Sequence, residues 1–170
     1  RIFYSNPLRI FKEKKVDVLF ECIGQSDGMS KKIVEIALKN GIHVITPNKA
    51  LIAKHGDKLS ILAEKKNVNL EFEASVAGGI PILKLIREGL IVNEIHKLTG
   101  ILNGTANYIL SEMEIEEKNF DEVLLDAQEK GYAEADPSFD IDGIDAAHKI
   151  IILSGLAYGK MPSINNLSIK

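Results

Sequence analysis

Three apolar segments that alternate with helical segments restrict the fold more than any other feature of the sequence. "VDVLFECIG" (Val16–Gly24) is a nearly continuous apolar run closed by glycine, and "IHVIT" (42–46) and "VNLEFEA" (68–74) follow it. Such runs are typical of buried parallel strands. The order strand, helix, strand, helix, strand predicts an α/β fold, a doubly wound sheet with right-handed crossovers.

The two helices between these strands have recognisable ends. Ser26 or Asp27 can cap the first helix, and Asn40–Gly41 is a stop signal for it. Its apolar positions follow helical spacing at Ile33, Val34, Ala37 and Leu38. The second helix is predicted over 50–66, with Gly56 as a point where it could break.

Beyond Ala74 the pattern changes, and we place a boundary near residue 75 between domains over 1–75 and 76–170. A glycine loop, "SVAGGIP", opens the second part. "NEIHKLTGIL" (93–102) predicts a strand. Helices are expected at about 82–87, 106–113, 120–130 and 143–158. The second part is therefore predicted to be α+β.

The stretch "GYAEADPSFDIDGIDAAHK" (131–149) concentrates carboxylates before an apolar helix. "DIDG" matches the middle of a calcium loop, but Lys149 would then replace the glutamate that the loop requires, which excludes that interpretation. A structural interpretation fits the spacing better. Asp142 can cap the helix, Asp145 lies three residues on as in a capping box, and Asp145–Lys149 is an i,i+4 pair.

A functional interpretation of the same stretch rests on the helix that follows. From Ile150 to Leu156 the helix is apolar on nearly every face, so it is predicted to be buried. Lys149 would then lie where a helix enters the protein, and an ammonium in such a place needs partners. With Asp145 one turn away, Lys149 is a candidate proton donor.

Three other segments have both a functional and a structural interpretation. Lys49 in "TPNK" follows the carboxyl end of a predicted strand, where ligands collect in open α/β sheets, but loop lysines are usually only solvated. Glu73 and the turn "SVAGGIP" suit a cation held mainly by carbonyls, or are a tight interdomain turn. Asn103–Thr105 could bind an anion at a helix start, or only cap it.

Composition excludes several classes of function. The net charge of −3 gives no basic field for nucleic acid, and no apolar run reaches the length of a membrane span. Cys22 is the only cysteine, so it cannot form an internal disulfide, which fits a cytoplasmic protein. The chain starts at Arg1 and enters structure almost at once, and we expect it to be a fragment.

Four segments together resemble the homoserine dehydrogenase family. They are "GIHVITPNKALIA", "FEASVAGGIPIL", "GILNGTANYILSEM" and "GYAEADPSFDIDGIDAAHK", in the family's order and at its spacings. The resemblance runs from about Asp17 to Gly159. It implies NAD(P)-dependent interconversion of L-homoserine and L-aspartate 4-semialdehyde, a step toward threonine and methionine. It also implies part of a Rossmann-like nucleotide-binding domain, then a catalytic and dimerisation domain on a mixed sheet, and a homodimer.

The resemblance also assigns residues to roles. Lys149 matches the family's proton-transferring lysine and Asp145 its orienting partner. Substrate binding is assigned to Glu134, which holds the ammonium, and to Lys49 and Asp140. Cofactor contacts are assigned to Ile23, Gly24 and Lys49. A sodium-like monovalent cation is assigned to Glu73 with the carbonyls of Val76, Gly78 and Ile80.

One departure from the family pattern affects what the chain is expected to do. The glycine-rich phosphate loop G-x-G-x-x-G is absent, so we expect this chain by itself to bind the cofactor poorly. Gln25 replaces a second glycine found in many members. Two alternatives stay open: an inactive binding or dimerisation module on the same scaffold, and a dehydrogenase of another amino-acid semialdehyde. The sequence does not distinguish NAD from NADP.

Overall fold

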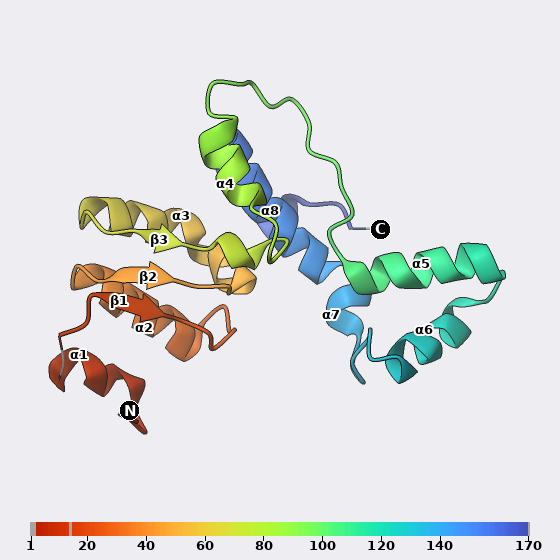
Figure 1. The fold of residues 1–170 in the computed structure, drawn as a ribbon, viewed down its shortest axis with the longest axis horizontal. Coiled ribbons are helices and arrows are strands. Elements are labelled where there is room, and N and C mark those ends of the chain that lie inside the picture. Colours follow the sequence, from red (N-terminus) through yellow and green to blue (C-terminus); the bar gives the residue numbers. More distant parts are fainter. Residues whose placement is uncertain (1–2, 14, 170) are drawn as a thin grey trace.

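The computed structural model of the chain, which describes residues 3–13 and 15–169, contains one parallel three-stranded sheet (Figure 1). Its strands are β1 (Val18–Phe20), β2 (His43–Ile45) and β3 (Leu70–Glu71), in the order β1-β2-β3. The α/β prediction is confirmed. The strands are shorter than the apolar runs that predicted them, because pairing extends only over the residues that face a neighbour.

The helices α2 (Gly28–Lys39) and α3 (Lys49–Lys65) connect the strands and contact each other. They cover the side of the sheet that carries Val44, which is fully buried. The other side is uncovered among the described residues, and Phe20 there is 68% exposed. The expectation that these strands are buried on both faces is therefore wrong for this part of the chain.

Helices make up the rest of the fold. A short turn η1 (Pro7–Arg9) and α1 (Ile10–Glu13) precede the sheet, and η2 (Glu73–Ser75) follows it. Then come α4 (Ile82–Lys84), a π-helical turn η3 (Leu85–Gly89), α5 (Gly104–Glu116), α6 (Phe120–Glu129), α7 (Ser138–Ile141), α8 (Ile144–Tyr158) and η4 (Ile164–Asn166). In Figure 1, α5 and α6 lie apart from the sheet, and α8 runs back toward it.

The predicted strand over 93–102 does not form. Among the described residues this segment has no regular structure, and it belongs to a long connection that arches away from the body of the molecule (Figure 1). A strand needs a neighbouring strand to bond its backbone, and the sheet of the described residues holds only β1, β2 and β3. The mixed sheet of the second part is accordingly not formed here.

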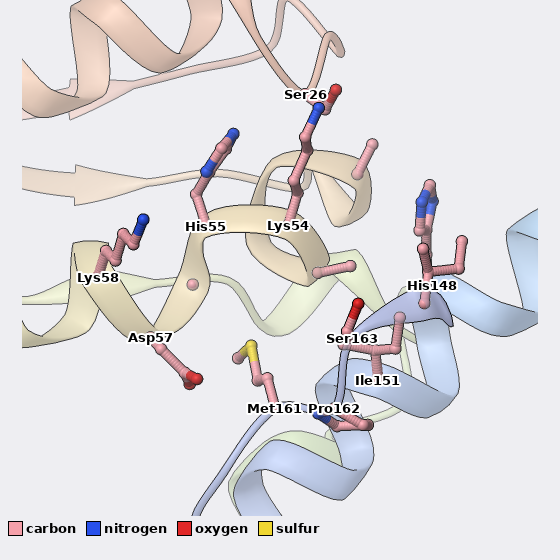
Figure 2. A pocket seen from close by; sticks show the side chains of 14 residues that line it. Ser26, Lys54, His55, Asp57, Lys58, His148, Ile151, Met161, Pro162 and Ser163 are labelled. Atoms are coloured by element: carbon pink, nitrogen blue, oxygen red, sulfur yellow. The ribbon is translucent and has the colours of Figure 1, made fainter. Parts of the chain in front are cut away.

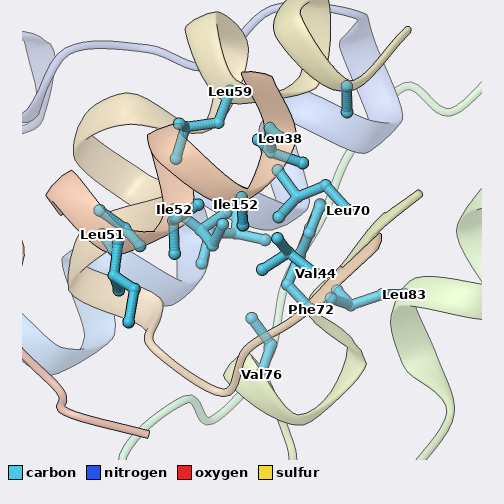
Figure 3. Packing of buried hydrophobic residues seen from close by; sticks show 14 of the residues in the cluster. Leu38, Val44, Leu51, Ile52, Leu59, Leu70, Phe72, Val76, Leu83 and Ile152 are labelled. Atoms are coloured by element: carbon cyan, nitrogen blue, oxygen red, sulfur yellow. The ribbon is translucent and has the colours of Figure 1, made fainter. Parts of the chain in front are cut away.

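Two clusters of buried residues hold the chain together. The larger, seen in Figure 3, packs side chains of the sheet and its helices against Val76, Leu83 and Ile152. The smaller consists of Ile109, Val123, Ala127 and Ala133 and joins α5 to α6. The larger cluster thus contains residues from both sides of position 75, and the division into two domains stays a prediction.

The helices α3 and α8 pack closely because two glycines face one methionine. Gly56 lies inside α3, which is continuous, so the break expected there does not occur. A Cβ atom at Gly56 would lie 2.8 Å from Met161 Sδ and Cε, and one at Gly155 would overlap Met161 Cγ. The absence of side chains at both positions leaves room for Met161 between the helices.

Within the described part of the chain, the helices are all too short or too polar to cross a membrane.

Candidate active site

The buried carboxylate of Asp145 is the centre of a cluster of charged groups. Asp145 lies in the first turn of α8, and its side chain is 5% exposed. Its Oδ1 atom is 2.9 Å from Lys49 Nζ, and its Oδ2 atom accepts a hydrogen bond of 2.7 Å from Lys149 Nζ. One carboxylate therefore holds two ammonium groups, one from the start of α3 and one from α8.

Asn103 completes the environment of this carboxylate. Its Nδ2 atom donates to Asp145 Oδ2 at 2.9 Å and to Asp140 Oδ1 at 2.7 Å. Its Oδ1 atom accepts from the backbone amide of Ala106 at 2.7 Å and so caps α5. The sequence left a cap and an anion site open for this segment. The structure shows the cap, and it adds a role that the sequence did not indicate, because one amide connects two carboxylates.

The position of Lys149 is fixed by two acceptors. Besides Asp145, the carbonyl oxygen of Leu102 accepts a hydrogen bond of 2.6 Å from Lys149 Nζ. The Lys149 side chain is 20% exposed. Because an ammonium carries three N–H donors, one remains for a ligand once these two bonds are formed.

The start of α8 differs from the predicted cap. Asp142 has a near-helical backbone, its amide bonds to the carbonyl of Ser138, and it ends α7. Gly143 takes the N-cap position with φ of +71°, and no side chain caps the helix. The prediction of Asp142 as N-cap of α8 is wrong, because Asp142 is the C-cap residue of the short helix α7 that precedes it. The predicted Asp145–Lys149 pair is confirmed.

The polar partners of Asp145 determine its protonation. Burial by itself raises the pKa of this carboxyl group. Hydrogen bonds from Lys149, Lys49 and Asn103 outweigh burial, and the pKa lies below its ordinary value of 3.8. Asp145 is therefore a carboxylate at neutral pH and keeps both lysines paired.

Lys49 also borders a small cavity that reaches the end of β1. The cavity has a volume of about 210 Å³ and is lined by Cys22, Gly24, Pro47, Asn48, Lys49, Ala50 and Phe139. Lys49 Nζ lies 5.7 Å from the centre of the Phe139 ring. Two of the three residues predicted to contact the cofactor, Gly24 and Lys49, therefore share one cavity.

Gly24 suits close approach by a flat ligand. Its φ is +90°, which a residue with a side chain rarely adopts, and a Cβ atom there would meet nothing within 4 Å. Ile23 beside it is 47% exposed. Bare backbone thus faces open space near the carboxyl end of a parallel strand, where ligands bind in open α/β sheets, and the assignment of these residues to the cofactor stays a prediction.

The remaining predicted residues are less closely grouped. Asp140 joins the cluster through Asn103, as described. Glu134 is exposed on the turn between α6 and α7, where its backbone carbonyl accepts from Gln128. Among the described residues, its carboxylate forms no hydrogen bond or ion pair with Lys49, Asp145 or Lys149. Its role in substrate binding stays a prediction.

The predicted cation residues form a turn whose groups are partly engaged. Glu73 Oε1 accepts from the amide of Leu83 at 3.0 Å, and the Ile80 carbonyl accepts from the amide of Ile82 at 2.8 Å. Across the described residues, no group of three or more His, Cys, Asp or Glu side chains could hold a metal ion. That finding does not concern main-chain carbonyls such as those of Val76 and Gly78.

A larger cavity, about 560 Å³, lies elsewhere, between α3, α8 and the segment around Met161 (Figure 2). Two of its polar side chains, Lys54 and His55, contact Asp27, whereas His148 Nδ1 is buried without a hydrogen-bond partner among the described residues. His148 also lines it, and burial lowers the pKa of this imidazole. Lys49 lines the smaller cavity but not this one, and Asp145 pairs with Lys49, so we place the candidate active site at the smaller cavity.

Comparison with known families gives the same name for both halves of the chain. A family model described as "Homoserine dehydrogenase, NAD binding domain" matches residues 4–73, and one described as "Homoserine dehydrogenase" matches residues 81–170. The homoserine dehydrogenase of Neisseria gonorrhoeae is 52% identical over 157 residues, which are 92% of this chain and 36% of that protein. That of Bacillus subtilis is 42% identical over 161 residues, 95% of this chain and 37% of the relative.

Solved structures agree with this match. A homoserine dehydrogenase from Thiobacillus denitrificans superposes with a TM-score of 0.86 at 51% identity, over 91% of this chain and 36% of that one. A hyperthermophilic archaeal homoserine dehydrogenase in complex with NADPH gives a TM-score of 0.87 at 32% identity, over 99% of this chain and 54% of that one. The chain spans little more than a third of the bacterial relatives' length. With both halves matched, the chain belongs to the homoserine dehydrogenase family.

Proposed function

We propose that the protein that carries this chain interconverts L-homoserine and L-aspartate 4-semialdehyde with NAD(P). One observation carries the proposal: Asp145 binds Lys49 and Lys149 together, beside the cavity that contains Gly24. Reduction of an aldehyde requires a hydride for the carbon and a proton for the oxygen. Bound NAD(P)H supplies the hydride, and a fixed ammonium can supply the proton.

Lys149 is the proposed proton donor. Two of its three N–H groups are directed at Asp145 and Leu102, so the third can be directed at the substrate oxygen. Asp145 keeps that ammonium oriented and neutralises it, and it does the same for Lys49. As negative charge develops on the substrate oxygen, two ammonium groups held in a partly buried site stabilise it.

Several finer assignments belong to the same proposal. Glu134 and Asp140 would hold the ammonium of the amino-acid substrate. Ile23, Gly24 and Lys49 would contact the nicotinamide end of the cofactor. The turn with Glu73, Val76, Gly78 and Ile80 would bind a sodium-like monovalent cation, and the complete protein would be a homodimer in the cytoplasm. The family match supports NAD(P) as the cofactor and a small-molecule substrate, and the remaining assignments rest on the sequence motifs.

The proposal is tested by replacing Lys149 in the complete protein. Lys149→Ala should lower kcat for aspartate 4-semialdehyde by roughly 10²–10⁴-fold, the usual size of a general-acid contribution. The Kd of NADPH should change little, because the lysine lies on α8 rather than in the turns that line the cavity. Steady-state assays at saturating NADPH measure kcat, and a fluorescence titration with NADPH measures the Kd.

Three outcomes would contradict the proposal or part of it. A folded Lys149→Ala protein with normal turnover would leave the acidic stretch a structural feature. A wild-type protein that binds NADPH but reduces another amino-acid semialdehyde faster would keep the reaction type and change the substrate. A wild-type protein without any reductase activity would favour the inactive module.

A further inference from the structure

A buried carboxylate outside the charged cluster has no role in the function proposed above. Glu21 follows β1, is 2% exposed, and has no cationic partner among the described residues. Burying a carboxylate without a cation is unfavourable unless hydrogen bonds replace the lost water. The hydrogen bonds that Glu21 accepts therefore indicate the role of this buried carboxylate.

The two oxygens of Glu21 hold two different parts of the chain. Its Oε1 atom accepts from the amides of Ile23 at 2.8 Å and Gly24 at 3.4 Å, and from the hydroxyl of Ser30 in α2. These bonds fix the turn after β1 against the start of α2. They involve the two residues whose backbone is assigned to the nicotinamide end of the cofactor.

The Oε2 atom of Glu21 holds the turn after β2. It accepts from Thr46 Oγ1 at 2.6 Å and from Asn48 Nδ2 at 3.3 Å. Asn48 Nδ2 also donates to the carbonyl of Gln25 at 2.8 Å, and its Oδ1 caps α3 through the amide of Leu51 at 3.1 Å. Lys49, which contacts Asp145, is the next residue and begins α3.

The hydrogen bonds also account for the charge state of this group. Burial by itself raises the pKa of Glu21. Bonds from Ser30, Thr46, the amide of Ile23 and Asn48 outweigh burial and bring the pKa below its ordinary value. A carboxylate can accept all of these bonds at once, because it has about four lone-pair directions and no hydrogen.

We propose that Glu21 is a positioning residue for the cofactor side of the site, which ties the Cys22–Gln25 turn to the Thr46–Lys49 turn. Both turns line the cavity of about 210 Å³, one through Gly24 and the other through Lys49. Glu21 sets the spacing between the backbone that would face the nicotinamide and the lysine that would face the substrate. The inference rests on the proposed function, and it adds a residue that the function did not require.

The test is a set of substitutions in the complete protein. Glu21→Gln keeps one oxygen for Ile23 and Gly24 but turns an NH₂ group toward the NH₂ group of Asn48. It therefore weakens only the hydrogen bonds to the Thr46–Lys49 turn. Glu21→Ala removes the hydrogen bonds to both turns. We expect the Kd of NADPH to rise and kcat to fall by roughly 10-fold for Glu21→Gln and up to 100-fold for Glu21→Ala, because small misplacements of reacting groups cost that much.

A positioning role predicts a pattern that loss of stability alone does not. The pH profile of kcat should keep its wild-type shape, since Asp145 and Lys149 lie on α8. The KM of the amino-acid substrate should rise less than the Kd of NADPH, because only Lys49 among the residues assigned to the substrate lies in a turn that Glu21 holds. The matched control is Leu38→Ala, a fully buried residue near the C-terminal end of α2, whereas Ser30, which contacts Glu21, lies near the start of that helix. It should lower Tm and leave the NADPH Kd of the folded protein unchanged.

The result that overturns the inference is normal NADPH affinity and turnover in folded Glu21→Gln. If Glu21→Ala does not fold, Thr46→Val removes the 2.6 Å bond with little change of shape, and normal NADPH affinity in that variant also counts against the inference. The proposed function can fail separately. If the wild type binds NADPH without reducing the aldehyde, the NADPH Kd still decides the role of Glu21, and wild type that does not bind NADPH overturns both.

Discussion

Asp145 is the single residue on which the charged cluster depends. Asp145→Asn keeps the shape of the side chain but leaves Lys49 and Lys149 without their counter-charge. We expect a loss of about 2–4 kcal/mol in the free energy of unfolding at pH 7, the range for breaking a buried charge-assisted contact. Urea unfolding of both proteins measures the difference.

The difference in free energy of unfolding between wild type and Asp145→Asn should also depend on pH. Because folding lowers the pKa of Asp145 below 3.8, the unfolded chain binds this proton first as pH falls. The stabilisation by Asp145 is therefore fully present above pH 3.8 and is lost as pH falls through the lower folded pKa. The stability gap between wild type and Asp145→Asn should shrink in that acidic range, and a gap that grows there would contradict the assignment.

Asn103 and Asn119 offer a matched pair for separating a cap from a site residue. Both cap a helix through Oδ1, but only Asn103 also donates to Asp140 and Asp145. Each change to alanine should cost about 1 kcal/mol of stability through the lost cap. Only Asn103→Ala should also lower kcat, by roughly tenfold or more, because it removes a hydrogen bond that orients Asp145. Equal kcat values for the two variants would show that Asn103 acts only as a helix cap.

At the scale of elements, the contact between α3 and α8 depends on how Met161 fills the space between two glycines. A methyl group at Gly155 meets Met161 Cγ, which can move only if χ1 and with it the whole side chain reorients, whereas one at Gly56 meets the flexible end of that side chain. We expect Gly155→Ala to cost about 1–3 kcal/mol from overpacking. Gly56→Ala should be near neutral, because the gain in helix propensity offsets the shift of Met161.

Thermal unfolding of these two variants, alone and with Met161→Ala, tests that account. Without the methionine side chain both alanine changes should become neutral or stabilising, since the obstacle is gone while the helix propensity remains. A Gly155→Ala penalty that persists in the Met161→Ala background would point to another cause.

At the scale of the whole molecule, the segment 91–101, which connects the two clusters of buried residues, is mostly exposed. Ile91, Val92 and Ile101 are 75%, 90% and 76% exposed, and the segment between them has no regular structure. Thermolysin, which cuts before such side chains, should cleave this 170-residue chain first within 91–101. The two pieces should co-elute in size-exclusion chromatography, because α8 packs on α3 and Asp145 holds Lys49. A first cut inside α3 or α8 would contradict this view.

The sequence predicted those features whose cause is local. Strand order, the bounds of α2 and α6, and the Asp145–Lys149 pair all follow from apolar spacing or from i,i+4 geometry. The prediction from sequence failed where contacts with another segment of the chain determine the local structure. The strand predicted over 93–102 has no strand beside it among the described residues, and Asp142, the predicted N-cap of α8, is the C-cap of α7. The contact of Asn103 with Asp145 and the role of Glu21 were missed, because Asp145, Thr46 and Asn48 are distant in sequence from the residues they contact.

Those distant partners have a consequence for the order of events in folding. Asn103 and Asp145 are 42 positions apart, and Lys149 reaches a carbonyl 47 positions before it. Closing such loops costs conformational entropy that local contacts do not, and synthesis makes the sheet before α8 exists. Lys49 therefore emerges from the ribosome long before Asp145, its counter-charge. The active site is a late product of folding, and gain of activity marks its completion rather than its beginning.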